Sequence, residues 1–101
     1  MDMAAEKSIA AEKQGQKILV EVKSFLGRSF INNLEQAMGQ YLIYRDIVLE
    51  KKLDFKLYLA ITTGVYQNYF QRKLTRTIVK RNRVNLLIFD SEGEVIEQWI
   101  N

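Results

Sequence analysis

The stretch IAAEKQGQKILVEVKSFLG, residues 9–27, decides the fold of this chain. Gln14 and Gly15 stand between two runs of strand-forming residues, and a short glycine-containing turn between two such runs is typical of a β-hairpin. We therefore expect strands at about 8–13 and 17–25, joined by a tight turn.

Side chains of the second strand alternate between its two faces. Branched aliphatic residues share one face: Ile18, Val20 and Val22. Glu21 and Lys23 share the other, beside apolar neighbours. A carboxylate can hold Mg²⁺ through oxygen, and a neighbouring lysine can place a water molecule or offset the charge of a phosphate. The same spacing is common in solvated or cross-strand ion pairs, so the residues alone leave both interpretations open.

Hydrophobic patterning downstream predicts a helix capped by Ser29, a strand, a second helix and two further strands. We place them, in that order, at about 30–51, at 54–61, from Gly64 onwards, at 86–89 and at 95–100. The order ββαβαββ predicts an α/β fold with a mixed β-sheet flanked by helices. A length of 101 residues suits a single domain spanning 1–101.

Apolar side chains at helical spacing define both predicted helices. The expected stripe of the first helix consists of Ile31, Leu34, Met38, Leu42 and Leu49. Ile43 and Ile47 lie away from this stripe, so we expect the helix to be covered on two sides. An i, i+4 ladder predicts one continuous second helix and consists of Tyr66, Phe70, Leu74 and Ile78.

The first predicted helix also carries polar side chains at i, i+4 spacing, Gln40 and Tyr44. Beside the strand that carries the acid and the lysine, an amide and a phenol could hold a DNA phosphate or an attacking water. They could equally mark an ordinary helix boundary, with Tyr44 half buried and Gln40 solvated.

The chain contains no Cys and no His. This excludes disulfides, thiolate and imidazole metal ligands, Cys nucleophiles and His-dependent acid–base catalysis. Any chemistry must come from oxygen-bearing or basic side chains, with a hard cation bound through oxygen. No apolar run approaches the roughly 18 residues of a membrane span, and no signal peptide is recognisable. We therefore expect a cytoplasmic protein without membrane contact.

Positive charge concentrates in residues 72–83, RKLTRTIVKRNR, which contain no acid although the net charge is only +3. Basic side chains spaced by four, four and three residues would project from one helix face: Arg72, Arg76, Lys80 and Arg83. Several phosphate contacts from such a face would give salt-sensitive DNA binding that does not depend on base sequence. A solvated face that aids solubility is the alternative.

Several segments, in order, resemble the XisH family over nearly the whole chain. They are IAAEKQGQKILVEVKSFLG at 9–27, LEQAMGQYLIYR at 34–45, LYLAI at 57–61, VYQNYF at 65–70 and LLIFDSEGEVIEQWI at 86–100. Members are known from cyanobacteria as factors required for excision of the fdxN element during heterocyst differentiation, and are often found with a small partner, XisI. The resemblance thus implies an excision controlling factor that contacts DNA, an XisI-like protein, or both.

The family's fold is similar to that of the PD-(D/E)xK nuclease superfamily, so the resemblance implies a restriction-endonuclease-like core. Asp2 would take the place of the first motif acid, and Glu21 and Lys23 those of the next acid and the lysine. Asp2 and Glu21 would then bind Mg²⁺ or Mn²⁺. Gln40 and Tyr44 match the Q-x-x-x-Y pattern that some superfamily members carry on the next helix.

The chain departs from the family pattern at its start, because it begins almost at the motif acid. We therefore expect an N-terminal truncation that removes the family's first helix and first strand. Apolar surface would then be left for a partner or for a homo-oligomer. Two functions stay open: an accessory DNA- or partner-binding protein on a nuclease-like scaffold, and a metal-dependent endonuclease that cleaves DNA phosphodiesters. The product of a shortened gene is a third interpretation.

Overall fold

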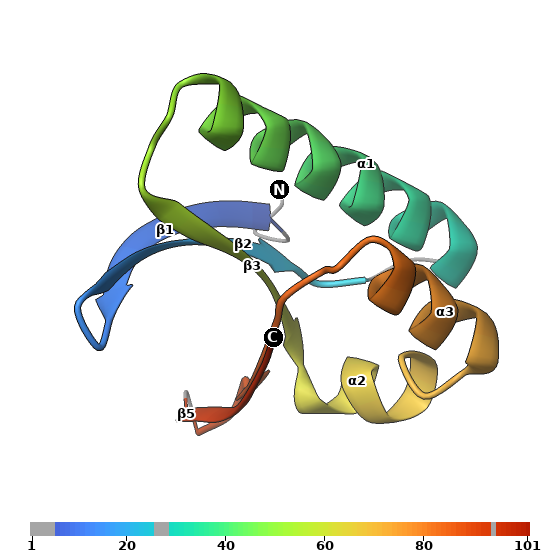
Figure 1. Ribbon diagram of the computed structural model, residues 1–101. Helices are drawn as coiled ribbons and strands as arrows, with labels where there is room; N and C mark the ends of the chain where they lie inside the picture. Colours follow the sequence, from blue (N-terminus) through green and yellow to red (C-terminus); the bar gives the residue numbers. More distant parts are fainter. Residues whose placement is uncertain (1–5, 26–28, 94) are drawn as a thin grey trace.

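The computed structural model describes residues 6–25, 29–93 and 95–101. The elements within them are β1 (Glu6–Lys13), β2 (Gln16–Lys23), α1 (Phe30–Glu50), β3 (Phe55–Thr62), α2 (Thr63–Tyr69), α3 (Lys73–Arg81), β4 (Leu86–Asp90) and β5 (Val95–Ile100). The strands described form a sheet in chain order, with β2, β3 and β4 parallel and β1 and β5 antiparallel to their neighbours (Figure 1). The expected α/β fold with a mixed sheet is confirmed.

The β1–β2 hairpin has the turn that the sequence predicts. Gln14 and Gly15 have φ values of 52° and 83°, and the type I′ hairpin turn requires positive φ at both of its central positions. The register pairs Ala10 with Leu19. Since side chains alternate along a strand, β2 enters the sheet with Glu21 and Lys23 on one face.

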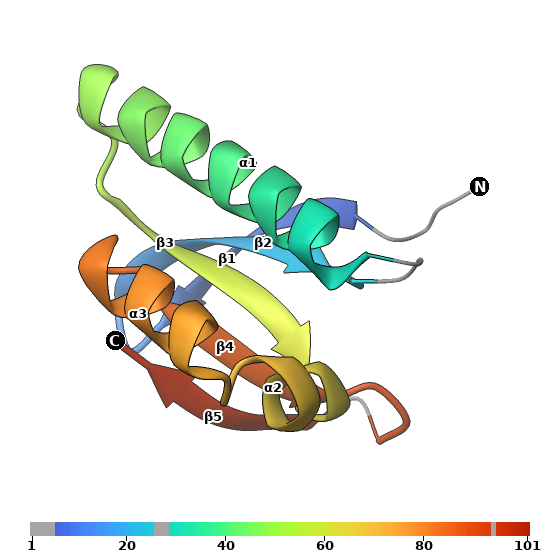
Figure 2. The same ribbon diagram turned by 90° about the vertical axis from the view of Figure 1, so that its right-hand side faces the viewer.

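The helices described all pack on one face of the sheet (Figure 2). α1 begins where expected, because the Ser29 hydroxyl accepts a 3.1 Å hydrogen bond from the amide of Asn32. We call the apolar layer between helices and sheet the helix-side core. Its buried members are Leu34, Ala37, Met38, Tyr41, Leu57, Leu59, Ile61, Phe70, Val84, Leu86 and Ile88.

The opposite face of the sheet closes on itself, so the described helices flank the sheet on one face alone. The sheet curls (Figure 1). The Lys13 ammonium of β1 lies 4.6 Å from the centre of the Trp99 ring on β5. Curling gathers a second buried cluster, which contains Ile18, Val20, Tyr58, Ala60 and Leu87. Apolar residues of this face are therefore buried without a helix over them.

The expected single helix after Gly64 is also wrong, because α2 and α3 are separated by a break at residues 70–72. Phe70 is only 3% exposed, and its ring meets the rings of Phe25 and Phe30 edge-on, with centroids 5.4 and 6.0 Å apart. Leu74, the next member of the expected ladder, is 58% exposed. The core contact of Phe70 thus overrides helical periodicity, and the observed order is ββαβααββ rather than ββαβαββ.

The buried stripe of α1 matches the expected one only in part. Leu34 and Met38 are buried as expected, whereas Ile31 and Leu49 are exposed and Val48 is buried instead. Leu49 follows Val48 by one residue and therefore points about 100° away around the helix. The rotation of α1 about its own axis therefore decides which of the two neighbouring apolar residues, Val48 or Leu49, is buried.

The outer side of α1 carries Ile43 and Ile47, which are 59% and 43% exposed. The described residues do not supply the second cover that we expected for this helix. None of the described helices is both long and apolar enough to cross a membrane.

We expect Tyr41→Phe to lower the free energy of unfolding by about 1–3 kcal/mol, because buried polar groups then lose a partner. The Tyr41 side chain is fully buried, and its hydroxyl donates to the Leu57 carbonyl and accepts from the Asn85 amide, both at 3.0 Å. Denaturant unfolding followed by circular dichroism measures the change. Tyr69→Phe is the control, since that ring keeps its stacking on Phe30. Equal losses of unfolding free energy in the two variants would contradict the role that we assign to the Tyr41 hydroxyl.

Candidate functional site

Glu21 and Lys23 lie side by side on the helix-side face of β2. Glu21 is the sheet partner of Leu59, a member of the helix-side core, and Lys23 follows on the same face. The two residues are 4% and 5% exposed. This face is therefore closed to solvent at both residues. Burial lowers the pKa of Lys23, because a charged ammonium loses hydration in an apolar layer.

Gln40 and Tyr44 of α1 lie at the boundary of the same layer. Tyr44 is half buried and packs against the helix-side core. Gln40 is half buried too, and its Oε1 is a buried acceptor with no hydrogen-bond partner in the described part of the chain. Glu21, Lys23 and Tyr44 thus lie on the helix side of the sheet, where Tyr44 packs against the helix-side core. Asp2, the remaining predicted member, lies outside the described residues.

The described residues supply one carboxylate, Glu21, of the cation site that the resemblance implied. Mg²⁺ is usually held by one or two carboxylates together with water and phosphate oxygens. Among residues 6–25, 29–93 and 95–101, no group of three or more acidic side chains comes together as a metal site. The second carboxylate of the expected pair, Asp2, lies outside these residues. The Mg²⁺ or Mn²⁺ site therefore stays a prediction.

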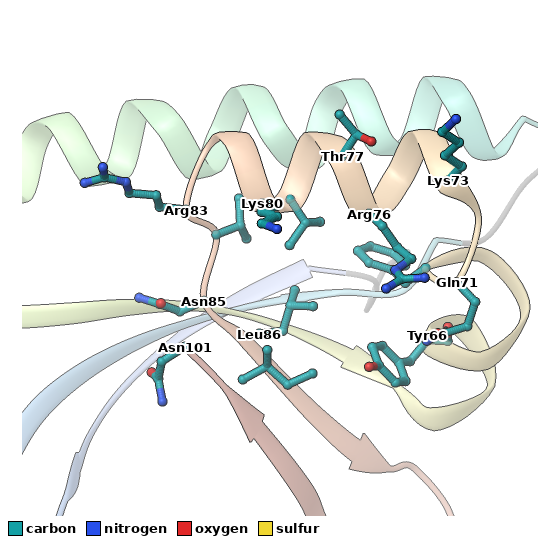
Figure 3. Close-up of a pocket in the computed structure, with 14 residues that line it drawn as sticks. Tyr66, Gln71, Lys73, Arg76, Thr77, Lys80, Arg83, Asn85, Leu86 and Asn101 are labelled. Atoms are coloured by element: carbon teal, nitrogen blue, oxygen red, sulfur yellow. The ribbon is translucent and has the colours of Figure 1, made fainter.

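Three of the four predicted basic residues, Arg76, Lys80 and Arg83, line a cavity of about 1030 Å³ between α3 and the β4–β5 pair, which we call the α3 cavity (Figure 3). Its basic lining residues are Lys73, Arg76, Lys80 and Arg83. Arg76 and Lys80 point from α3 toward the strands, whereas the Lys73 amine points away from them (Figure 3). None of the described residues that line the cavity has an acidic side chain.

Arg72 is not among the residues that line the cavity. It is the N-cap residue of α3, and its guanidinium lies 4.8 Å from the ring centre of Tyr69 and 5.6 Å from that of Phe30. Cation–π contacts of this kind hold the start of α3 on the aromatic cluster. Arg83 lies beyond the end of the helix, with a φ of 53°, yet still reaches the cavity. We predicted four basic residues on one helical face. Three of them, Arg76, Lys80 and Arg83, line the cavity instead.

Sequence reasoning missed the rest of the lining. Apolar members include Phe70, Val84, Leu86 and Ile100, and polar members include Tyr66, Gln71, Asn85 and Asn101. Tyr66 and Gln71 lie at one end of the cavity and Asn85 and Asn101 at the other (Figure 3). These residues come from α2, the loops around α3, β4 and β5, so no local pattern joins them.

Comparison with known proteins identifies the family. The family model described as XisH protein matches residues 1–97. The chain belongs to the XisH family. An XisH family protein from Nostoc punctiforme, solved by crystallography, shares 44% identity with a TM-score of 0.88. The crystal structure of an fdxN element excision controlling factor protein from Anabaena variabilis shares 46% identity with the same TM-score.

Each of these alignments covers 93% of this XisH-family chain and 74% of the solved one. None of the curated proteins matches the chain. XisH membership confirms the resemblance seen in the sequence. The restriction-endonuclease-like core and the roles of individual residues stay predictions.

Proposed function

We propose that this XisH-family chain helps to control excision of a DNA element, as an accessory DNA-binding protein on a nuclease-like scaffold. Family membership and the description of the Anabaena variabilis relative as an fdxN element excision controlling factor support the setting. A separate recombinase would cut and join the strands. The α3 cavity is the observation that carries the DNA-binding part.

The charge of the α3 cavity suits the DNA backbone. Arg76, Lys80 and Arg83 line the cavity, and its described lining contains no acidic side chain to repel a phosphate. Arginine forms paired hydrogen bonds to phosphate oxygens, and lysine acts as a point charge. Contacts of this type release counterions and do not depend on base sequence.

The burial of Glu21 and Lys23 supports an accessory role over a cutting one. A scissile phosphate must approach both side chains, and both are almost completely removed from solvent. Exposed basic residues around the α3 cavity, in contrast, can meet DNA without any rearrangement.

We expect the chain to bind duplex DNA with an affinity that falls steeply with salt, and Lys80→Ala to reduce the slope of log K against log salt by about 1. Arg81→Ala is the matched control, because Arg81 is an exposed neighbour on α3 that does not line the cavity. Fluorescence anisotropy at several salt concentrations measures both slopes. Equal effects of the two substitutions would show that general surface charge, rather than this cavity, contacts DNA.

A divalent-metal-dependent endonuclease is the second candidate. The placement of Glu21 and Lys23 on one face of β2 favours it, as does the buried Oε1 of Gln40, which has no hydrogen-bond partner among the described residues. An orphaned buried acceptor costs stability, and such groups are often kept for function. Catalysis would further require a second carboxylate, for which Asp2 is our candidate, and an opening of α1 over β2.

We expect no nicking of supercoiled plasmid with Mg²⁺ or Mn²⁺ beyond that of the Glu21→Gln variant. Gel electrophoresis of nicked and linear plasmid measures this, with Glu12→Gln, an exposed glutamate on β1, as the matched control. Nicking that Glu21→Gln and Lys23→Ala abolish, and that Glu12→Gln retains, would establish the endonuclease instead.

A further inference from the structure

We propose that the α3 cavity takes an unpaired nucleotide of a DNA strand, with phosphate on its basic side and the base against its apolar wall. This inference rests on the proposed DNA binding and goes further, because it names the form of DNA that the site accepts. It assigns base contact to residues that the sequence did not single out.

The shape of the site is the first argument. Small-molecule pockets have volumes of roughly 300–1,000 Å³, and the α3 cavity has about 1030 Å³. A duplex keeps its bases stacked inside and would offer only its outer phosphates to the rim, so that the hollow would stay unfilled. An unpaired nucleotide can turn its base into it.

The chemistry of the walls is the second argument. Leu86 and Ile100 form part of an apolar wall, and Tyr66 presents a half-buried ring at one end. Sites for single strands combine a positive groove that follows the backbone with aromatic side chains on which bases stack. The amides of Gln71 and Asn85 can both donate to and accept from base edges. A purely electrostatic phosphate site would need none of these groups.

An acidic peptide would be attracted electrostatically by the same basic side chains. It would not use the ring of Tyr66 as a stacking surface, and this difference separates the two ligands. The nucleotide is favoured because aromatic, apolar and amide groups line one hollow together with the cations.

The test is fluorescence anisotropy with a labelled 12-nucleotide single strand and with the same strand in a duplex, at one salt concentration. We expect the single strand to bind about tenfold more tightly. Tyr66→Leu, which keeps apolar contact and removes the stacking ring, should weaken single-strand binding by about fivefold or more and leave duplex binding unchanged. Arg76→Glu should abolish binding of both, whereas Arg81→Glu on the same helix should change neither by more than about twofold. Circular dichroism checks that each variant is folded.

Equal affinity for single strand and duplex, with both sensitive to Arg76→Glu, would overturn the nucleotide inference and leave the proposed DNA binding intact. A wild-type chain that binds neither the single strand nor the duplex would overturn the nucleotide inference and the proposed DNA binding together. The competitors are polyglutamate and unlabelled DNA of equal charge. Equal displacement of the labelled single strand by the two would also overturn the inference, in favour of an acidic peptide.

Discussion

The hydroxyl of Tyr41 ties together segments that lie far apart in the sequence. It donates to the carbonyl of Leu57 on β3 and accepts from the amide of Asn85, just before β4. The Asn85 side chain donates to the same Leu57 carbonyl at 3.1 Å, and the Asn85 carbonyl accepts from Leu59 at 2.8 Å. Buried polar groups must find partners, and here they satisfy one another. The position of α1 and the wall of the α3 cavity are therefore set by one network.

The helix side of the sheet is consequently closed at one end and open at the other. Glu21 and Lys23 on β2 are removed from solvent, whereas a hollow lies between α3 and the β4–β5 pair. Arg45 strengthens this arrangement, because its guanidinium donates to the Asn82 carbonyl at the end of α3. The buried acid and lysine of β2 and the basic cavity thus share one side of the sheet, and of these two described sites the cavity is the accessible one.

Local chemistry made most of the elements predictable, since the Gln14–Gly15 turn and the Ser29 cap depend on neighbouring residues alone. The break between α2 and α3 could not be predicted, because it depends on Phe70 meeting rings from distant segments. The spacing of the basic residues was apparent in the sequence, but the α3 cavity that they line was not. Burial of Glu21 was equally hidden, since alternation gives the face of a side chain and not what covers that face.

Cross-linking of a strand that carries 5-bromodeoxyuridine, with mass spectrometry of the linked peptides, tests the central claim most directly. The account predicts that ultraviolet light joins the base to peptides from residues 66–86, which contain most of the α3 cavity lining. Linked peptides from β2 and α1, with residues 66–86 unmodified, would contradict it. DNA would then reach the acid and lysine on β2, and the cavity would be only a charged surface.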